Sequence, residues 1–266
     1  MIDFHNHILP EVDDGSKSLA MSLNMLRKAE EQGITDIVNT VHYQHPKVEG
    51  KDITFEKITS EINNLQKIAD QNQIGIKIHS GAEVFYLPNL PKIIDDPLTT
   101  FGNGKYMLIE FPVLQLPPNF EDTLFDLSMK GVTPIIAHPE RYLVVQEDIV
   151  VLAELVQRGY LVQLDAGSII GTFGENARRS AHQILSRGLC HIIGSDSHND
   201  TTRNICLQEA VSFCMKELGI DITEFVLDNP QKVLNGEEIE TEVNLDYLIY
   251  RKKSVWKQLK NAFIGH

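Results

Sequence analysis

The sequence predicts an α/β fold, specifically a distorted TIM-like barrel of seven strand–helix units followed by a C-terminal tail. Four amphipathic stretches end in a glycine and lead at once into an apolar strand, at Gly33, Gly131, Gly159 and Gly188. Because glycine adopts the left-handed conformation that ends helices, these positions indicate helix-to-strand joints. Histidine or acidic residues follow six of the seven expected strands. A closed barrel gathers such strand ends around one axis, whereas an open doubly wound sheet spreads them along a line.

The expected strands lie near residues 1–5, 36–42, 76–83, 106–111, 133–138, 160–165 and 190–196. The almost continuous apolar run at 106–109 suits a parallel strand that is covered on both faces. Between the strands, apolar residues recur at spacings of three and four, as at 55–68 and 149–156, which predicts amphipathic helices. Helices near 203–218 and 222–228 complete the domain, and Asn229-Pro230 is expected to stop the second of them.

The length of 266 residues suits one barrel, which typically takes roughly 250 residues. We therefore expect a single catalytic domain over residues 1–236 and a tail over 237–266. The tail begins with an acidic run at 237–242, and the segment 251–260 then carries five basic residues without an acid. Val255, Leu259 and Phe263 are four apart, which predicts a short basic amphipathic helix. This helix either packs on the barrel or contacts an anionic membrane surface or a partner.

The charge and the cysteines exclude several classes of function. With 24 basic and 37 acidic residues the net charge is −13, which opposes general binding to nucleic acid. The three cysteines are an odd number without close pairing, which indicates a reducing compartment, and we expect a cytoplasmic protein that is neither secreted nor integral to the membrane. A cysteine-dependent phosphatase needs Arg six positions after its Cys. The residues six positions after Cys190, Cys206 and Cys214 are instead Asp196, Ser212 and Ile220.

The strand ends predict a metal cluster at one mouth of the barrel. Its nine expected ligands are His5, His7, Asp14, His42, Glu83, Glu110, His138, Asp196 and His198. Five imidazoles and four carboxylates suit manganese, iron or zinc better than calcium, which prefers more oxygen ligands. Four carboxylates contribute −4 and three divalent ions +6, which leaves +2 to match a phosphate monoester dianion. Such ions lower the pKa of a bound water to about 7 and supply a hydroxide, so we expect a phosphoester hydrolase.

Several residues near these motifs remain open. One of Asp13 and Asp14 is expected to cap the loop and the other to bind metal, and Asp14 is the favoured ligand. His45 follows His42 closely and either faces the site or the solvent. Arg141 and Arg203 follow metal-binding strand ends, and their guanidinium groups suit phosphate oxygens, although surface ion pairing is the alternative. A single Glu at a strand end could equally be a helix-cap partner or a member of a buried ion pair.

Together these motifs resemble the polymerase and histidinol phosphatase (PHP) family. They are most similar to its bacterial manganese-dependent protein-tyrosine phosphatases of capsule and exopolysaccharide clusters. The matching segments are 5–10, 12–15, 40–42, 81–83, 108–111, 136–141 and 194–199, and the likeness extends over about residues 1–235. One departure is Asp165, where a small hydroxyl or amide residue is expected, and we leave it out of the ligand set.

The resemblance implies a site for three divalent metal ions, with manganese expected and iron, zinc or magnesium as alternatives. It places one ion between His5, His7, Glu83 and Asp196, a second between Glu83, Glu110 and His138, and a third between Asp14, His42 and His198. It also implies that Arg141 and Arg203 lie near the phosphate. The implied substrate is phosphotyrosine on a membrane-associated bacterial tyrosine kinase that regulates polysaccharide synthesis. Alternatives are a small-molecule phosphomonoesterase such as a histidinol phosphatase, or a non-catalytic, metal-stabilised partner of a kinase.

Overall fold

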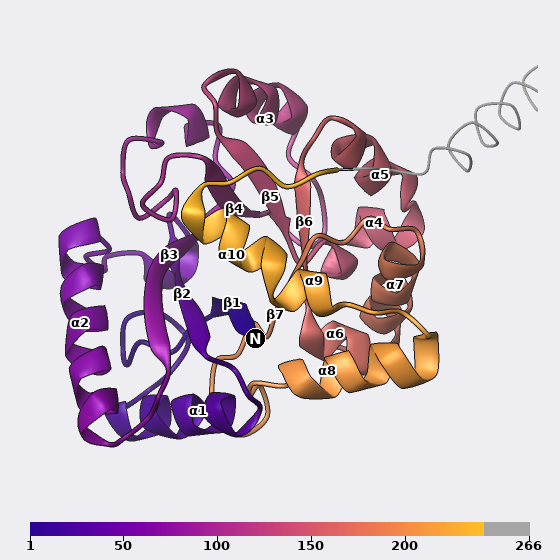
Figure 1. Ribbon diagram of the computed structural model, residues 1–266. Coiled ribbons are helices and arrows are strands. Elements are labelled where there is room, and N and C mark those ends of the chain that lie inside the picture. Colours follow the sequence, from indigo (N-terminus) through magenta and orange to yellow (C-terminus); the bar gives the residue numbers. More distant parts are fainter. Residues whose placement is uncertain (242–266) are drawn as a thin grey trace, which may run out of the picture.

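A computed structural model describes residues 1–241 and shows seven parallel strands, each paired with the next in chain order (Figure 1). The strands are β1 (Ile2–Asn6), β2 (Asp36–Tyr43), β3 (Lys77–Phe85), β4 (Tyr106–Glu110), β5 (Thr133–Ala137), β6 (Leu161–Asp165) and β7 (Ile192–Gly194). Their order and direction confirm the predicted α/β barrel. Residues 242–266 lie outside the described part of the chain, and with them the predicted amphipathic helix around Val255, Leu259 and Phe263.

Helices surround the strands on the outside of the barrel, as Figure 1 shows. They are α1 (Leu19–Glu31), α2 (Phe55–Gln71), α3 (Phe120–Met129), α4 (Leu143–Glu147), α5 (Val150–Gln157), α6 (Ala166–Ile170), α7 (Glu175–Ser186), α8 (Leu207–Phe213), α9 (Thr223–Val226) and α10 (Asp228–Asn235). Short 3-10 turns lie at Pro46–Val48, Leu90–Lys92 and Pro139–Arg141. Among residues 1–241, none of the helices combines the length and the apolar character that crossing a bilayer requires.

The first and last strands meet and nearly close the barrel. The backbone N–H of Asp196 donates to the carbonyl of His5 (2.8 Å), and the N–H of His7 donates to the carbonyl of Ser197 (3.0 Å). This approach requires glycine at position 194, because a Cβ atom there would lie 2.5 Å from Cβ of His5 and 2.6 Å from its backbone nitrogen. The contact places His5 and His7 beside Asp196 and His198, the first and last of the predicted ligands in the sequence.

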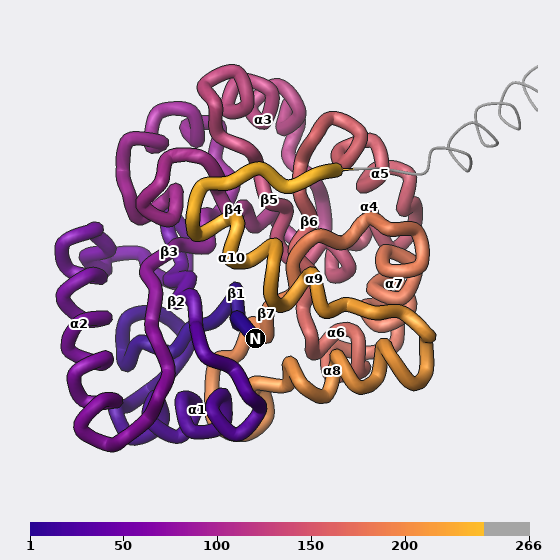
Figure 2. The backbone as a smooth tube through the Cα atoms, in the orientation of Figure 1, coloured from indigo at the N-terminus to yellow at the C-terminus, as the bar shows by residue number. Residues whose placement is uncertain are grey.

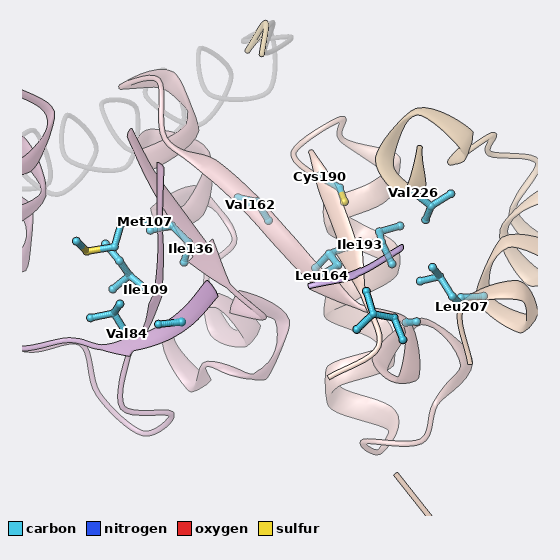
Figure 3. Close-up of a cluster of buried hydrophobic side chains, with 14 of the residues drawn as sticks. Val84, Met107, Ile109, Ile136, Val162, Leu164, Cys190, Ile193, Leu207 and Val226 are labelled. Atoms are coloured by element: carbon cyan, nitrogen blue, oxygen red, sulfur yellow. The ribbon is translucent and has the colours of Figure 1, made fainter. Parts of the chain in front are cut away.

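Side chains of each strand alternate between two apolar cores. Tyr106 and Leu108 of β4 point into the barrel, where they pack with residues such as Phe4, Phe101 and Ile135. Outward-facing residues of the strands pack under the surrounding helices in a second, larger core. Figure 3 shows part of this outer core, with Met107 and Ile109 of β4 beside Ile136 of β5. Burial on both faces explains the continuous apolar runs seen in the sequence.

The amino ends of the strands are covered by α10, which lies across this end of the barrel (Figures 1 and 2). Val233 belongs to the barrel interior, and Leu234 and Ile239 pack against it. The Asn103 side-chain amide donates to the carbonyl of Val233 (2.7 Å), and the Tyr106 hydroxyl donates to the carbonyl of Glu237. Among residues 1–241, the amino end of the barrel is therefore filled, and the predicted ligands lie at the opposite end.

Three predictions about the last helices differ from the structure. Asn229-Pro230 does not stop a helix, because both residues lie in the first turn of α10, where a missing proline N–H is tolerated. The preceding helix, expected over 222–228, ends at Val226. The helix expected from residue 203 begins only at Leu207, because the residues from Asp196 to Arg203 form an irregular loop over the barrel mouth. A π-helical turn, Cys214–Leu218, ends that helix.

Candidate metal centre

All nine predicted ligands lie at the carboxyl end of the barrel, and the period of the strands directs His42 and Glu110 toward its mouth. Inward-facing positions along a strand recur every second residue, so Val38, Thr40 and His42 of β2 point to the same side. On β4 the series Tyr106 and Leu108 leads likewise to Glu110. The lower members of each series fill the apolar interior, and the last member faces the mouth.

Glu83 is the centre of the cluster. Its Oε2 atom lies 3.3 Å from Nε2 of His5, 3.3 Å from Nε2 of His7 and 3.0 Å from Nδ1 of His42. Its Oε1 atom lies 2.7 Å from Nε2 of His138. One carboxylate therefore faces imidazoles from three other strand ends, which is the arrangement of a carboxylate that bridges two ions.

The ligand atoms form four overlapping groups whose atoms lie within 4.8 Å of one another. These are His5 with His7 and Asp196; His5 with Glu83 and His138; His42 with Glu83 and Glu110; and His7 with Asp14, His42 and His198. The groups resemble the three ligand sets implied by the sequence motifs. They differ in that Glu83 is absent from the group of His5, His7 and Asp196, and that Glu110 and His138 lie in separate groups, with His42 and with His5 respectively. His7 also joins the Asp14 group.

Several buried nitrogen and oxygen atoms of this cluster make no regular hydrogen bond and fit bound cations. Among residues 1–241 these include Glu110 Oε2, His42 Nδ1, His198 Nε2 and Asp14 Oδ1, of which His42 Nδ1 lies 3.0 Å from Oε2 of Glu83 and His198 Nε2 lies 3.3 Å from Oδ1 of Asp14. A buried polar atom without a partner is unfavourable, so such a concentration indicates missing ligands. Imidazole nitrogens and carboxylate oxygens are the donors that divalent transition metals prefer. The residues present therefore fit a divalent metal centre.

The carboxylates of the cluster also raise the pKa values of their neighbours, which indicates that the site favours bound positive charge. Burial lowers the pKa of His5, but the Glu83 and Asp196 carboxylates outweigh this and raise it to about 9. The pKa of His7 is raised well above its usual range, because Asp13 and the other carboxylates overcome the effect of burial. Burial and the nearby Glu83 carboxylate raise the pKa of Glu110. Without metal the site therefore takes up protons, and bound cations would replace them.

Three further contacts orient the ligating imidazoles. Nδ1 of His7 is 2.7 Å from Oδ2 of Asp13, and Nδ1 of His5 is 3.0 Å from Oε1 of Gln163. Nδ1 of His198 is 3.0 Å from the carbonyl of Asp196. Such partners fix which ring nitrogen faces the metal. Asp13 also accepts the N–H of Gly15 (2.9 Å), so the Asp13 side chain caps the loop and Asp14 faces His42.

Both predicted arginines point at one ligand rather than at the protein surface. Nη1 of Arg141 donates to Oδ2 of Asp196 at 2.8 Å, and Nη2 of Arg203 donates to the same oxygen. Arg141 also contacts Oδ2 of Asp165 at 3.2 Å, which gives that unexpected carboxylate a role in holding the arginine. The nearby carboxylates outweigh burial and raise the pKa of Arg141. Two fixed positive charges therefore lie beside the metal cluster.

Two basic residues of the loop after β2 also face the mouth. His45 stacks on His42 with 4.5 Å between ring centroids, and its Nε2 lies 3.4 Å from Oε2 of Glu110. Burial and the neighbouring His42 lower the pKa of His45 to about 4. Lys47 Nζ lies 2.8 Å from Oδ2 of Asp14. Sequence analysis had left His45 open and had not identified Lys47, because nothing in a loop's sequence fixes its direction.

Strained backbone at two ligands is a further sign of a functional site. His138 and Asp196 have φ values of 32° and 49°, in the left-handed region that residues other than glycine rarely occupy. Such strain persists where surrounding contacts determine the conformation, and it is concentrated at active sites. At both positions the chain leaves its strand, and the turn directs the side chain toward the other ligands.

His79 and His182, which lie away from the cluster, and the cysteines have structural roles. His79 pairs with Asp36 (2.7 Å), and His182 contacts the carbonyl of Ile169 (2.9 Å). All three cysteines are free, and burial raises the pKa of Cys206 to about 12 and that of Cys214 to about 11. Thiols with raised pKa values are poor nucleophiles at neutral pH. The geometry therefore agrees with the sequence in excluding a cysteine nucleophile.

Comparisons with known proteins agree with this geometry. A family model described as "Capsular polysaccharide synthesis, CpsB/CapC" matches residues 1–235. Tyrosine-protein phosphatase YwqE of Bacillus subtilis is 32% identical over 240 residues, which cover 90% of this chain and 93% of YwqE. Tyrosine-protein phosphatase CpsB of Streptococcus pneumoniae is 32% identical over 246 residues, which cover 90% of this chain and 100% of CpsB.

A solved structure supports the same assignment at the level of the whole barrel. It comes from a study of YwqE from Bacillus subtilis and CpsB from Streptococcus pneumoniae, described there as unique metal-dependent tyrosine phosphatases. The match has a TM-score of 0.85 at 32% identity and covers 91% of this chain and 97% of the solved chain. The resemblance predicted from the sequence motifs is thereby confirmed. The chain belongs to the CpsB/CapC family of capsular polysaccharide synthesis.

Proposed function

We propose that this protein is a metal-dependent protein-tyrosine phosphatase that hydrolyses phosphotyrosine. The observation that carries the proposal is the convergence of the metal cluster and two guanidinium groups on Asp196. A cluster of cations beside two arginines suits the dianionic phosphoryl group of a monoester. The family relatives named as tyrosine-protein phosphatases support the same reaction.

In this proposal the nine clustered residues hold three divalent ions, with manganese the expected metal. Bound ions would supply a nucleophilic water at neutral pH and would neutralise charge on the phosphoryl oxygens. Glu83 would be among the residues that hold the ions, and Asp13 and Gln163 orient the imidazoles of His7 and His5. Arg141 and Arg203 would bind the phosphoryl oxygens.

A cavity beside the cluster has room for the substrate chain. It has a volume of about 540 Å³ and is lined by the loop after β2, including Tyr43, His45, Lys51 and Ile53. Its mixed polar and apolar lining suits a tyrosyl ring and the adjoining peptide. The relatives named as tyrosine-protein phosphatases favour a phosphotyrosyl protein over a small amine such as histidinol phosphate.

The cellular partner in this proposal is a membrane-associated tyrosine kinase that controls capsular or exopolysaccharide synthesis. The family description, which refers to capsular polysaccharide synthesis, supports this partner. We also propose a cytoplasmic location, a domain boundary at Gly236, and peripheral membrane contact through the basic segment 251–260. The free, buried cysteines suit a reducing compartment.

The decisive experiment compares phosphotyrosyl peptide with histidinol phosphate at equal concentration, using the manganese-loaded protein. We expect hydrolysis of the peptide at a far higher kcat/KM. His5→Ala and Asp196→Ala are expected to keep the circular dichroism spectrum of the fold and to lose hydrolysis of the peptide. Faster hydrolysis of histidinol phosphate would favour the small-molecule phosphatase. Full activity in both variants would refute metal-dependent hydrolysis at this site.

A further inference from the structure

Phe173 contacts both of the arginines that lie beside the metal cluster. The guanidinium carbon of Arg141 lies 5.0 Å from the centroid of the Phe173 ring, and that of Arg203 lies 5.3 Å from it. Both distances are within the range of cation–π attraction, about 6 Å. Phe173 is half-buried and lies in the short loop between α6 and α7, away from the strands that carry the metal ligands.

The Phe173 ring is held in place by the backbone of α6. A Cβ atom at Gly167 would lie 2.7 Å from Cε2 of Phe173, so the ring packs directly on the glycine. The loop itself is tied to the same residue, because the backbone N–H of Thr172 donates to the carbonyl of Gly167 (2.8 Å). A residue with a side chain at position 167 would therefore displace the ring. The ring is a fixed surface rather than a freely rotating side chain.

The other contacts of the two arginines leave their orientation incomplete. Arg141 and Arg203 share Oδ2 of Asp196, whereas Oδ1 of the same carboxylate faces Nε2 of His5 (3.6 Å) and of His7 (3.5 Å). Arg141 also contacts Asp165 (3.2 Å), and Arg203 also donates to the carbonyl of Asp196 (3.1 Å). Within residues 1–241, Nε of Arg203 is buried without a hydrogen-bond partner. Among these residues, the Phe173 ring contacts both guanidinium groups and is not one of the predicted metal ligands.

We propose that Phe173 is a positioning residue that holds Arg141 and Arg203 side by side for the phosphoryl group of the substrate. The inference rests on the proposed phosphatase function. A guanidinium group that is held by an aromatic face loses less freedom when it binds an anion, so binding and hydrolysis both improve. Phe173 itself does not contact the metal ligands and acts through the two arginines.

The first test is Phe173→Leu in the manganese-loaded full-length protein. Leucine keeps the apolar packing and removes the aromatic face. We expect kcat/KM for a phosphotyrosyl peptide to fall roughly 5- to 30-fold, as expected for loss of contacts to two cations. Inhibition by inorganic phosphate should weaken in similar proportion, whereas bound metal should stay unchanged. Phe173→Tyr should restore both properties, and Phe125→Leu, at an exposed position of α3, should change neither.

Two further variants separate positioning from a general structural effect. Gly167→Ala should reproduce the losses of Phe173→Leu, because the added Cβ displaces the ring. In a protein that already carries Arg141→Ala and Arg203→Ala, Phe173→Leu should have little further effect on phosphate inhibition. If Phe173→Leu weakens phosphate inhibition equally in proteins with and without the two arginines, the inference is overturned. It is also overturned if phosphate inhibits Phe173→Leu as strongly as it inhibits the wild type. If the wild-type protein neither hydrolyses the peptide nor is inhibited by phosphate, the proposed function fails and this inference fails with it.

Discussion

Oε1 of Glu83 and Nε2 of His138 lie 2.7 Å apart at the mouth of the barrel, on strand ends separated by β4. The other oxygen of Glu83 faces three more imidazoles, and the whole carboxylate is buried. A buried carboxylate needs compensating positive charge. Glu83 faces four imidazoles of the cluster, so a change at this residue affects all four of them. Its substitution is therefore the most direct test of the metal centre.

Glu83→Gln should abolish most metal binding without unfolding the protein. The amide keeps the volume of the carboxylate but removes its charge and one of its two acceptors. In metalloproteins, substitution of a residue that only hydrogen-bonds to a metal ligand typically reduces metal affinity or activity about 10- to 100-fold. Substitution of a ligand itself should cost more, so we expect kcat/KM to fall about 100-fold or more. Metal content by mass spectrometry and kcat/KM for phosphotyrosyl peptide provide the measurement. Glu154→Gln, at an exposed position of α5, is the matched control, and full metal content in Glu83→Gln would refute the bridging role.

The arginines are expected to act on the phosphoryl group and not on the metal. Arg141→Lys and Arg203→Lys keep the positive charge but lose the planar fork that matches phosphate oxygens. We expect each to lower kcat/KM by about 100-fold, the usual loss when one donor to a transition state is removed. Metal content should remain that of the wild type. Arg27→Lys on α1 is the control, and a loss of metal in the Lys variants would instead indicate a role in holding Asp196.

The sequence allowed the barrel and the clustering of the nine ligands to be predicted because parallel strands end at one face of a barrel. Glu110, His138 and His5 follow or end such strands, so they had to share the mouth, although a turn at His138, and not the every-second-residue period, directs its side chain there. The helix boundaries near Pro230 were harder, because the same proline can end one helix or begin another.

Residues that act through long-range contacts could not be predicted. Gln163 lies within an apolar strand, and only the distance to His5 reveals that it orients a ligand. Phe173 has the sequence environment of an ordinary loop, and its importance depends on where Arg141 and Arg203 point. Lys47 reaches Asp14 only because of the conformation of the loop after β2. Such contacts depend on tertiary structure and leave no local pattern.

Metal removal should make the stability of the protein fall as the pH rises. In the chelated protein the pKa of His5 is about 9, above its usual value of 6.5. The protonated ring therefore contributes stability that is fully present below pH 6.5 and is lost as the pH rises through 9. From this difference the free energy of unfolding should fall on the order of 3 kcal/mol over that range.

The manganese-loaded protein should lack this fall over the same interval, because the ring is deprotonated in both the metal-bound folded state and the unfolded state. Metal ligands must be deprotonated, so affinity rises with pH, and bound metal stabilises only the folded state. Urea unfolding at pH 6.5, 7.5 and 9, with manganese or with chelator, gives the comparison. The stabilisation by manganese should increase at each step. A constant or decreasing difference between the two forms would contradict the assignment of His5 as a ligand.

Glu140 is a buried acid beneath the site, and its pKa predicts a second pH effect that does not involve metal. Burial and the Asp165 carboxylate raise its pKa to about 7, from a usual value of 4.5. The folded state therefore binds this proton more tightly, so the residue lowers stability as the pH rises from 4.5 through 7. Oε1 accepts the N–H of Asp165 (3.1 Å), and Oε2 has no hydrogen-bond partner within residues 1–241.

Glu140→Gln should therefore stabilise the protein at alkaline pH. The amide keeps an acceptor for the Asp165 N–H and avoids a buried negative charge beside a carboxylate. We expect a gain on the order of 1–3 kcal/mol at pH 8 that shrinks toward zero at pH 5, measured by urea unfolding in the presence of chelator. Glu147→Gln, on α4, should show no such dependence on pH. If Glu140→Gln lowers the free energy of unfolding equally at pH 5 and pH 8, the prediction is wrong. The carboxyl group then has a structural role that the amide cannot replace, and its ionisation does not lower the stability at alkaline pH.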